Sequence, residues 1–497
     1  MKYKPPGQHR TVEEFRRHLL SLDSSMGVDE KVLGGEGPLG RKVKVTPNGA
    51  TIGNRFAVQP MEGWDGTVSG LPSKHTLRRW RNFGRSGAKL IWGGEAFAVQ
   101  EDGRANPCQL YLNRNAEVGQ GLESLLQELK RGHQESGEKI DDLFVGLQLT
   151  HSGRFAQPYG PRAPRIAYHH PLLDPRVGLS PGAETLSDGE LEGIGENFAR
   201  AAKLAWNTGF QFVDVKCCHG YLLHELLGAH ARPGRYGGSF ENRTRFVRLV
   251  VEAIRSECPG LEIGVRASIC DVFPHSKNED TLCGEPKDWE KYVPYRHGFG
   301  IDAQDPRRPD FTEPLQFLKL LEEMGIRLVN ISVGSPYYCP HLQRPAAYPP
   351  SDGYLPPEDP LAGVIFHLRA VRVCKRAFPK LLLVGSGYSY LQEYLPNVAQ
   401  NEVEAGHVDF VGIGRMVLTY PQMPIDVLEG RRLNRKRICR TFSDCTTGPR
   451  LGLLSGCFPL DPYYRTLPEA ARLREVKRKN PVTSGTALAG KTGEVKK

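Results

Sequence analysis

The amino-acid sequence predicts an α/β protein: a (β/α)8 TIM barrel with an N-terminal extension and a short irregular C-terminal extension. Short apolar runs recur along the chain, and enough residues for a crossover helix separate each run from the next. Their near-continuous hydrophobicity is typical of strands buried on both faces of a parallel sheet. The eight runs are residues 55–61, 89–96, 143–151, 210–216, 262–269, 327–334, 380–387 and 408–415.

The segment between the third and fourth runs shows the helical pattern that links the strands. Ser187 can cap a helix over residues 187–207, and Glu190, three residues later, completes a capping box. Apolar residues recur on one face of this helix, and Gly209 ends it just before the next strand. Eight such units predict a closed barrel. The domains expected are an N-terminal extension at 1–45, a barrel at 46–430 and a C-terminal extension at 431–497.

Two segments interrupt the alternation of strands and helices. Residues 271–313 form a long connection after the fifth strand, at the barrel face where active sites are built, and they predict a substrate lid. The C-terminal extension is basic, with nine lysine or arginine residues against three glutamates between Arg465 and Lys497. Its Gly/Thr/Lys-rich end predicts disorder after about residue 480.

Composition describes a soluble globular protein, with 39% hydrophobic and 25% charged residues among 497. No run reaches the roughly 18 apolar residues of a membrane span, and the first residues lack the apolar core of a secretory signal, so we expect a cytoplasmic location. The net charge of +10 lies mostly in a tail without aromatics after Tyr464. Nucleic-acid binding is therefore not expected; a solvated tail is favoured over a polyanion-binding one.

The last two strands end in residues that favour a phosphate site. The seventh run ends in Gly385 and Gly387, and the eighth ends in Gly414 and Arg415. Glycines let backbone N–H groups approach a phosphate, and an arginine supplies the opposite charge. Tight turns are the alternative for each glycine taken alone, but together these positions favour phosphate.

Seven stretches occur in order between about residues 50 and 425: NRFAVQPM, QLTHSGR, VDVKCCHGYLLHELL, RYGGSFENRTRF, GVRAS, VGSG and VGIGR. Together they resemble the old yellow enzyme family of FMN-dependent oxidoreductases, in its branch near 2,4-dienoyl-CoA reductase. The resemblance implies a barrel that binds FMN on its carboxyl face and takes hydride from NAD(P)H. The cofactor-binding positions that it implies are Pro60, Met61, Glu95 and Ala96 beside the flavin, Gln148 at its pyrimidine edge, Arg266 near N1 and O2, and Gly385, Gly387, Gly414 and Arg415 at the phosphate.

The stretch VDVKCCHGYLLHELL carries the catalytic positions that the resemblance implies. In the family, a His-x-x-His or His-x-x-Asn pair grips a substrate oxygen, and a tyrosine two residues later protonates the adjacent carbon. These positions hold Lys216, His219 and Tyr221. The lysine charge predicts a carboxylate-bearing substrate. In the alternative, Lys216 turns away and pairs with Glu95 or Glu62.

Metal binding is not expected from either cysteine-containing stretch. In the tail, Cys439, Cys445 and Cys457 lack the C-x2-C pair of the 4Fe-4S proteins in the resembling branch, so no such cluster is predicted. The spacing of cysteines and histidines in VDVKCCHGYLLHELL fits no zinc site, and packed thiols are favoured.

The leading functional hypothesis is an FMN-dependent ene-reductase that transfers hydride from NAD(P)H to an activated C=C bond. An FMN-dependent amine or betaine dehydrogenase or demethylase is the second hypothesis, and a non-catalytic barrel that binds a polyanion is the third. The expected partner is a small-molecule substrate, with no membrane. The sequence is compatible with a homo-oligomer and leaves the natural substrate open.

Overall fold

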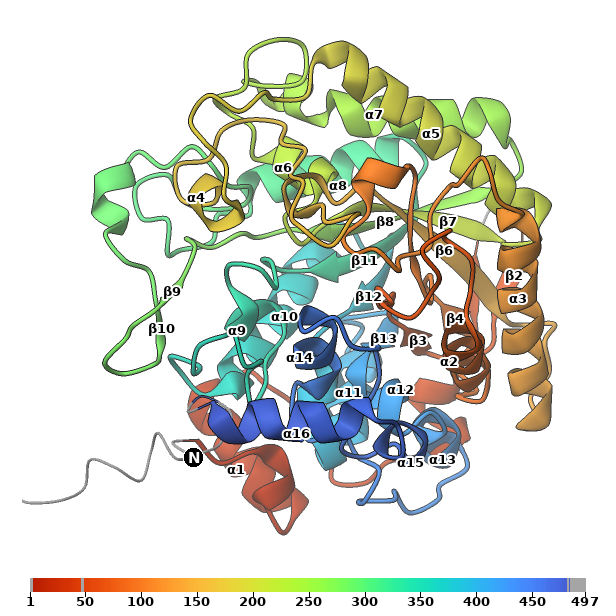
Figure 1. The fold of residues 1–497 in the computed structure, drawn as a ribbon. Coiled ribbons are helices and arrows are strands. Elements are labelled where there is room, and N and C mark those ends of the chain that lie inside the picture. Colours follow the sequence, from red (N-terminus) through yellow and green to blue (C-terminus); the bar gives the residue numbers. More distant parts are fainter. Residues whose placement is uncertain (1–2, 46–48, 481, 483–497) are drawn as a thin grey trace, which may run out of the picture.

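A computed structural model describes residues 3–45, 49–480 and 482, and within these residues the chain folds around a closed parallel barrel (Figure 1). The strands pair in the order β3, β4, β6, β7, β8, β11, β12 and β13, and β13 pairs with β3 to close the ring. Seven of the predicted apolar runs contain one of these strands and the fourth overlaps β7, which ends one residue beyond it, so the predicted TIM barrel is confirmed. Their bounds are Phe56–Val58, Leu90–Ile91, Phe144–Thr150, Phe212–Cys217, Glu262–Ser268, Leu328–Ser332, Leu382–Gly385 and Phe410–Ile413.

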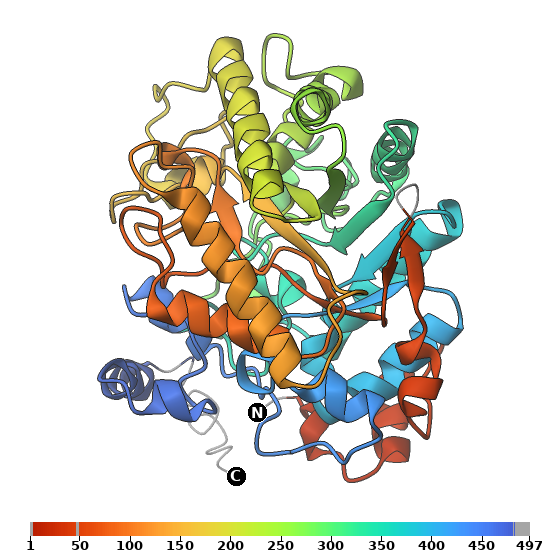
Figure 2. The same ribbon diagram turned by 90° about the vertical axis from the view of Figure 1, so that its right-hand side faces the viewer.

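Helices surround the barrel on its outside (Figures 1 and 2). In the described part of the chain, none is long and apolar enough to cross a membrane. The α-helices are α1 Val12–Leu22, α2 Lys74–Gly84, α3 Val118–Glu135, α4 Asp174–Val177, α5 Asp188–Asn207, α6 Leu222–Leu227, α7 Phe240–Glu257, α8 Thr312–Glu323, α9 Pro340–Gln343, α10 Pro360–Ala377, α11 Leu395–Glu404, α12 Arg415–Thr419, α13 Met423–Leu428, α14 Asp444–Arg450, α15 Pro462–Arg465 and α16 Glu469–Lys479.

Helix α5 begins and ends where the sequence predicts. The Ser187 hydroxyl accepts a hydrogen bond from the Glu190 backbone N–H at 3.2 Å, and the Glu190 carboxylate accepts one from the Ser187 N–H at 2.8 Å. These two bonds satisfy N–H groups that a helix start leaves unpaired. Gly209 follows with a φ of +98°, a conformation that glycine adopts without steric cost, and β7 then begins at Phe212.

An antiparallel hairpin closes the amino end of the barrel. Its strands are β1 Val43–Val45 and β2 Ala50–Ile52 (Figure 2), and they pack on a cluster that includes Trp92, Phe144 and Phe212. The Phe144 and Phe212 rings stack with centroids 5.2 Å apart. Because this end is filled by apolar side chains, the polar strand ends gather at the opposite, carboxyl end.

The connection over residues 271–313 is folded against the barrel. It contains β9 Ser276–Lys277, β10 Gly284–Glu285 and the 3-10 helix η6 Trp289–Tyr292. The Tyr295 side chain is buried and its hydroxyl contacts His170 Nε2 at 3.1 Å, while Arg307 lies 4.2 Å from the centre of the Trp289 ring. The connection thus makes ordered contacts, and its movement as a lid stays a prediction.

The C-terminal extension is more regular than expected, because it contains α14, α15 and α16. Helices α15 and α16 and the loop that follows α14 share a small apolar cluster, which gives short helices the tertiary packing that they need in water. The cluster consists of Leu453, Phe458, Tyr464, Ala470 and Leu473. The disorder predicted after about residue 480 falls almost entirely outside the described residues.

Replacing Phe212 with alanine should lower the free energy of unfolding by about 3 to 5 kcal/mol, the usual cost of removing a buried phenylalanine. Phe212 is fully buried, and Gly146 on the neighbouring strand leaves room for its ring. Urea unfolding followed by circular dichroism measures the change. Val68→Ala, at a side chain that is 68% exposed, is the matched control and should shift stability by less than about 0.5 kcal/mol. Equal unfolding midpoints for the two variants would show that the apolar cluster at the amino end of the barrel does not stabilise the fold.

Candidate active site

A cavity of about 750 Å³ lies at the carboxyl ends of the barrel strands. Strand ends, the loops that follow them and the C-terminal extension all contribute to its wall. Ten of the thirteen residues singled out from the sequence line it: Pro60, Met61, Gln148, Lys216, His219, Tyr221, Arg266, Gly387, Gly414 and Arg415. The fold therefore brings together residues that lie more than 350 positions apart in the chain.

The other three predicted residues, Glu95, Ala96 and Gly385, are buried outside the cavity wall. The Glu95 carboxylate accepts hydrogen bonds from Arg79 at 2.7 Å and from the Gly63 N–H at 2.8 Å. The Ala96 carbonyl accepts one from Gln109 at 2.8 Å, and the Gly385 carbonyl accepts one from Gln59 at 3.1 Å. These groups hold neighbouring segments in place and do not face the cavity.

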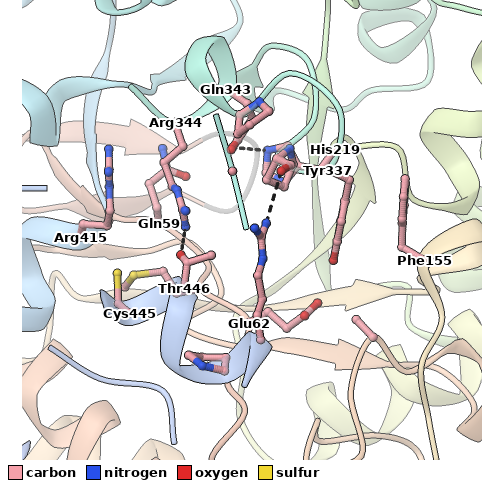
Figure 3. Close-up of a pocket in the computed structure, with 18 of the residues that line it drawn as sticks. Gln59, Glu62, Phe155, His219, Tyr337, Gln343, Arg344, Arg415, Cys445 and Thr446 are labelled. Atoms are coloured by element: carbon pink, nitrogen blue, oxygen red, sulfur yellow. Dashed lines mark hydrogen bonds between the residues drawn. The ribbon is translucent and has the colours of Figure 1, made fainter. Parts of the chain in front are cut away.

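Two arginines, Arg415 and Arg344, lie at one end of the cavity without an ion-pair partner among the described residues (Figure 3). Arg415 donates to the Pro345 carbonyl at 2.6 Å, and its Nη1 atom is buried without a hydrogen-bond partner. Arg344 donates to the hydroxyl of Thr446 in the C-terminal extension. Restricted access to water, together with the charge of Arg415, lowers the pKa of Arg344 to about 10. The two charges would be stabilised by an anion between them.

The middle of the cavity wall carries paired polar groups from three adjacent strands. Gln148 on β6 lies opposite Asp214 on β7 and donates to its carboxylate at 2.6 Å, and Lys216 on β7 lies opposite Arg266 on β8. Burial raises the pKa of Asp214 to about 6, against the effects of Gln148 and Arg266. Arg266 is buried, and its Nε atom has no hydrogen-bond partner. The arrangement leaves a buried guanidinium facing the cavity.

A sharp turn after β7 presents His219 to the cavity. His219 has a φ of +67°, which is unusual for a residue with a side chain and is often found at functional sites. Its Nε2 atom contacts the hydroxyl of Ser332 at 2.9 Å and the amide of Gln343 at 3.1 Å (Figure 3). Burial, followed by the charges of Arg266 and Lys216, lowers its pKa well below the usual value. The imidazole is therefore neutral near pH 7.

Lys216 does not form the ion pair with Glu95 that the sequence left open, because Arg79 occupies that carboxylate. The Lys216 ammonium lies 3.8 Å from the centre of the Tyr221 ring, a cation–π contact. It has no hydrogen-bond or ion-pair partner within the described ranges. Burial lowers its pKa, while the nearby charge of Glu62 acts in the opposite direction. Lys216 thus faces the cavity as a cation with spare hydrogen-bonding capacity.

The Tyr221 hydroxyl lies between two further groups of the cavity wall. It donates a hydrogen bond to the Glu62 carboxylate at 2.7 Å and contacts the Tyr337 hydroxyl at 2.9 Å. Tyr337 in turn stacks on Phe155, with ring centroids 4.0 Å apart. Burial, and then the charge of Glu62, raises the pKa of Tyr221 well above its usual value. Tyr221 is consequently a neutral phenol.

Sequence reasoning found no role in the site for Arg344, Tyr337, Gln343, Gln59 or Phe155, all of which line the cavity. The loop after β11 supplies the first three, and Tyr337 already lies five residues beyond the strand end. A search restricted to strand ends passes over such residues. The sequence signal that could have found them is the polar and aromatic content of this loop, SPYYCPHLQR, at the active face of the barrel.

The C-terminal extension forms one side of the cavity through residues 445–456. The thiol of Cys445 faces this cavity, while Cys439 is buried near Arg415. Within residues 3–45, 49–480 and 482, no group of three or more His, Cys, Asp or Glu side chains is placed to hold a metal ion. The absence of a 4Fe-4S cluster stays a prediction.

The sequence matches known flavin oxidoreductases. Residues 43–334 match the model of the NADH:flavin oxidoreductase / NADH oxidase family. The chain is 31% identical over 252 residues to NADH:flavin oxidoreductase FG08077 of Gibberella zeae, covering 46% of this chain and 57% of that one. It is 30% identical over 302 residues to an NADPH dehydrogenase of Bacillus subtilis, covering 59% and 72%. The match thus spans little more than half of the first relative and nearly three quarters of the second.

Solved structures share the fold. A 2-naphthoyl-CoA reductase superposes with a TM-score of 0.63 at 18% identity, covering 86% of this chain and 57% of that one. Histamine dehydrogenase from Rhizobium sp. 4-9 superposes with a TM-score of 0.59 at 20% identity, covering 85% of this chain and 52% of that one. The old yellow enzyme homologue of Zymomonas mobilis superposes with a TM-score of 0.52 at 19% identity, covering 80% of this chain and 94% of that one. The family match covers more than half of the chain, and the barrel carries its matched segments; the chain belongs to the NADH:flavin oxidoreductase / NADH oxidase family.

Proposed function

We propose that this protein binds FMN in the 750 Å³ cavity and reduces an activated C=C bond with hydride from NAD(P)H. The observation that carries the proposal is the division of one cavity into an anion-binding end and a proton-donating end. Arg344 and Arg415 form the first, and Lys216, His219 and Tyr221 form the second. When bound, FMN supplies the hydride-transfer chemistry that no side chain can provide.

The residues of the cavity fit FMN. The unpaired Nη1 atom of Arg415 and the unpaired charge of Arg344 suit a phosphate, and Gly387, with a φ of +90°, shapes the adjoining turn. Gln148 and Arg266 would contact the pyrimidine edge of the flavin, where a guanidinium stabilises negative charge. Pro60 and Met61 would lie along the ring system.

The second end of the cavity is equipped to polarise a substrate and protonate it. Lys216 and the neutral His219 would donate hydrogen bonds to the substrate oxygen that gains negative charge as hydride reaches the β-carbon. Tyr221, a neutral phenol in the cavity wall, would then protonate the α-carbon. Because Lys216 has no anionic partner of its own, an alkene that carries a carboxylate suits this end better than a neutral one.

A specific contact also supports the second candidate function, oxidation of an amine or C–H bond. The Tyr221 hydroxyl donates a hydrogen bond to Glu62, so this carboxylate could take the phenol proton as the phenol oxygen takes a proton from a substrate. Mixing the oxidised protein with NAD(P)H or with an amine distinguishes the two functions, because only the hydride donor of the actual reaction bleaches the flavin absorbance. A barrel without flavin in any preparation would support the third, non-catalytic hypothesis.

Replacing Arg415 with alanine should weaken FMN binding by about 1.5 to 3 kcal/mol, the contribution of a charge-assisted hydrogen bond. Arg344→Met should weaken it by a similar amount, because both guanidinium groups face the same end of the cavity. Flavin release on dilution, followed by fluorescence, measures the change. Arg200→Gln removes an exposed arginine from α5 and is the control. Unchanged retention in both cavity variants would remove this end as the phosphate site.

Replacing Lys216 with methionine should slow reduction of a carboxylate-bearing alkene about 10- to 100-fold more than that of its neutral analogue, since only the carboxylate loses a charged partner. Stopped-flow measurement of flavin reoxidation by the two matched alkenes gives this ratio. Lys319→Met, at an exposed lysine of α8, is the control. Equal losses on both alkenes would contradict the carboxylate preference.

Replacing Tyr221 with phenylalanine should slow alkene reduction about 10²- to 10⁴-fold, the usual contribution of a general acid. Flavin reduction by NAD(P)H should stay near the wild-type rate, because that step needs no proton from Tyr221. The two half-reactions are measured separately by rapid mixing. A variant that reduces the alkene at the wild-type rate would show that the proton comes from elsewhere.

Protein purified without oxygen should contain no stoichiometric iron or acid-labile sulfide. Cys439, Cys445 and Cys457 offer three thiols where a 4Fe-4S cluster takes four. Colorimetric assays for iron and sulfide test this expectation. About four irons per chain would show that a remote side chain completes the ligand set.

A further inference from the structure

Three hydroxyl and carboxyl groups form a continuous hydrogen-bonded chain along the cavity wall. The Tyr221 hydroxyl is 2.7 Å from Glu62 Oε2 and 2.9 Å from the Tyr337 hydroxyl, and all three side chains line the cavity. The Tyr221 side chain is only 3% exposed, whereas Glu62 and Tyr337 are half-buried at the cavity surface. These hydrogen bonds therefore connect the enclosed phenol of Tyr221 to two groups at the cavity surface, Glu62 and Tyr337.

The direction of the hydrogen bonds among these three groups depends on whether Glu62 is protonated or ionised. When Glu62 is ionised, it can only accept, so the single proton of Tyr221 points at Glu62 and Tyr337 must donate to Tyr221. A substrate carbon beside Tyr221 then meets an oxygen without an available proton. When Glu62 is protonated, it can donate to Tyr221, and the proton of Tyr221 is free to point at the substrate. Protonated Glu62 is the state that makes Tyr221 an acid.

The charge balance leads to the same conclusion. If Tyr221 gave up its proton while Glu62 stayed ionised, two negative charges would face each other in an enclosed site. Burial and the Glu62 charge already raise the pKa of Tyr221 well above its usual value, so this state is disfavoured. Tyr221 must gain a proton as it loses one. Lys216 contacts the face of the Tyr221 ring and not its hydroxyl, so Glu62 is the group placed to supply that proton.

We propose that Glu62 and Tyr221 form a proton relay, in which the Glu62 carboxyl protonates the Tyr221 oxygen as Tyr221 protonates the α-carbon of the substrate. The inference rests on the proposed function and extends it. In the step, the O–H bond of Glu62 breaks as a new Tyr221 O–H bond forms, and the old Tyr221 O–H bond breaks as the C–H bond forms. Glu62 is left ionised and takes a proton from water. Hydride delivered from NAD(P)H balances the addition.

Run in reverse, the relay removes a proton from a substrate and passes it through Tyr221 to ionised Glu62. The protonation state of Glu62 thus favours reduction when the carboxyl is protonated and oxidation when it is ionised. This dependence links the two candidate functions of the site to one side chain.

Tyr337 is the other neighbour of the Tyr221 hydroxyl, and it serves as the matched control. Its ring stacks on Phe155 and its hydroxyl contacts that of Tyr221, so it is a positioning group. Tyr337→Phe removes one hydrogen bond to Tyr221 without removing a proton source. Glu62→Gln removes the proton source and keeps a group of the same shape that can still hydrogen-bond.

The other charged groups around Glu62 must be held constant in the test. Lys216 faces it from β7, and the phenols of Tyr221 and Tyr337 face it from their loops. Arg79 of α2 contacts the adjacent Met61 carbonyl at 3.4 Å, but two buried carboxylates compensate its charge. Both test variants leave Lys216 and Arg79 unchanged.

The first experiment measures the rate of alkene reduction by the reduced holoenzyme as a function of pH. In the wild type, the rate should fall as pH rises, because the relay needs a proton on the Glu62 carboxyl. Glu62→Gln should be slowed about 10²- to 10⁴-fold and should lose this pH dependence, while Tyr337→Phe should keep the wild-type profile. If Glu62→Gln keeps the wild-type profile, the relay is wrong. If Tyr221→Phe is itself fully active, the proposed function of this end of the cavity is wrong.

The second experiment needs no turnover. 3-Fluorotyrosine is incorporated at position 221 of the FMN-loaded protein, and its ¹⁹F chemical shift is followed as pH changes. The signal should show a step as pH changes, because Tyr221 donates to Glu62 in one state of the relay and accepts from it in the other. Glu62→Gln should abolish that step, while Tyr337→Phe should retain it. A step that survives in Glu62→Gln would overturn the relay, whatever reaction the protein catalyses.

Discussion

The site depends on a buried ion-pair cluster at the edge of the cavity. Arg79 of α2 donates to Asp65 at 2.7 Å, to Glu95 at 2.7 Å and to the Gly94 carbonyl at 3.2 Å. Glu95 in turn accepts from the Gly63 N–H. A Cβ atom at Gly63 would lie 2.2 Å from Arg79, so only glycine allows this approach. These bonds fix the segment after β3, and that segment carries Pro60, Met61 and Glu62 into the cavity. Removing one partner of such a pair typically costs about 3 to 5 kcal/mol because a buried charge is left unpaired.

The cavity itself has the opposite property, because four of its cations form no ion pair with the described residues. Lys216 and Arg266 occupy neighbouring positions on adjacent strands, and Arg344 and Arg415 face each other at the far end. Burying like charges together is unfavourable unless an anion joins them. The protein is thus built with a local instability that a dianionic phosphate and an electron-rich ring would relieve. Ligand binding and stability are coupled by the same charges.

The sequence predicts the barrel and much of its active face because both follow from short-range patterns. Apolar runs give the strands, Ser187 and Glu190 give a helix start, and residues at strand ends such as Lys216 and Arg266 must meet at one face of a closed barrel. The sequence pattern does not tell whether a strand-end residue faces the cavity or an adjacent helix. The prediction therefore places Glu95 beside the flavin, whereas its side chain pairs with Arg79 of α2. Arg344 and Tyr337 belong to an irregular loop after β11, and its path depends on contacts with distant segments that no local periodicity records.

The contribution of the C-terminal extension to the cavity has a consequence for biosynthesis. Thr446 accepts a hydrogen bond from Arg344, and residues 445–456 form one side of the cavity. A chain that has been synthesised only through the barrel therefore lacks this side of the cavity. Domains fold as their residues leave the ribosome, in order from the amino end. The barrel can therefore form first, and the cofactor pocket is completed by a segment that is made after the barrel. Cofactor retention would therefore depend on synthesis beyond residue 456, the last residue of this wall.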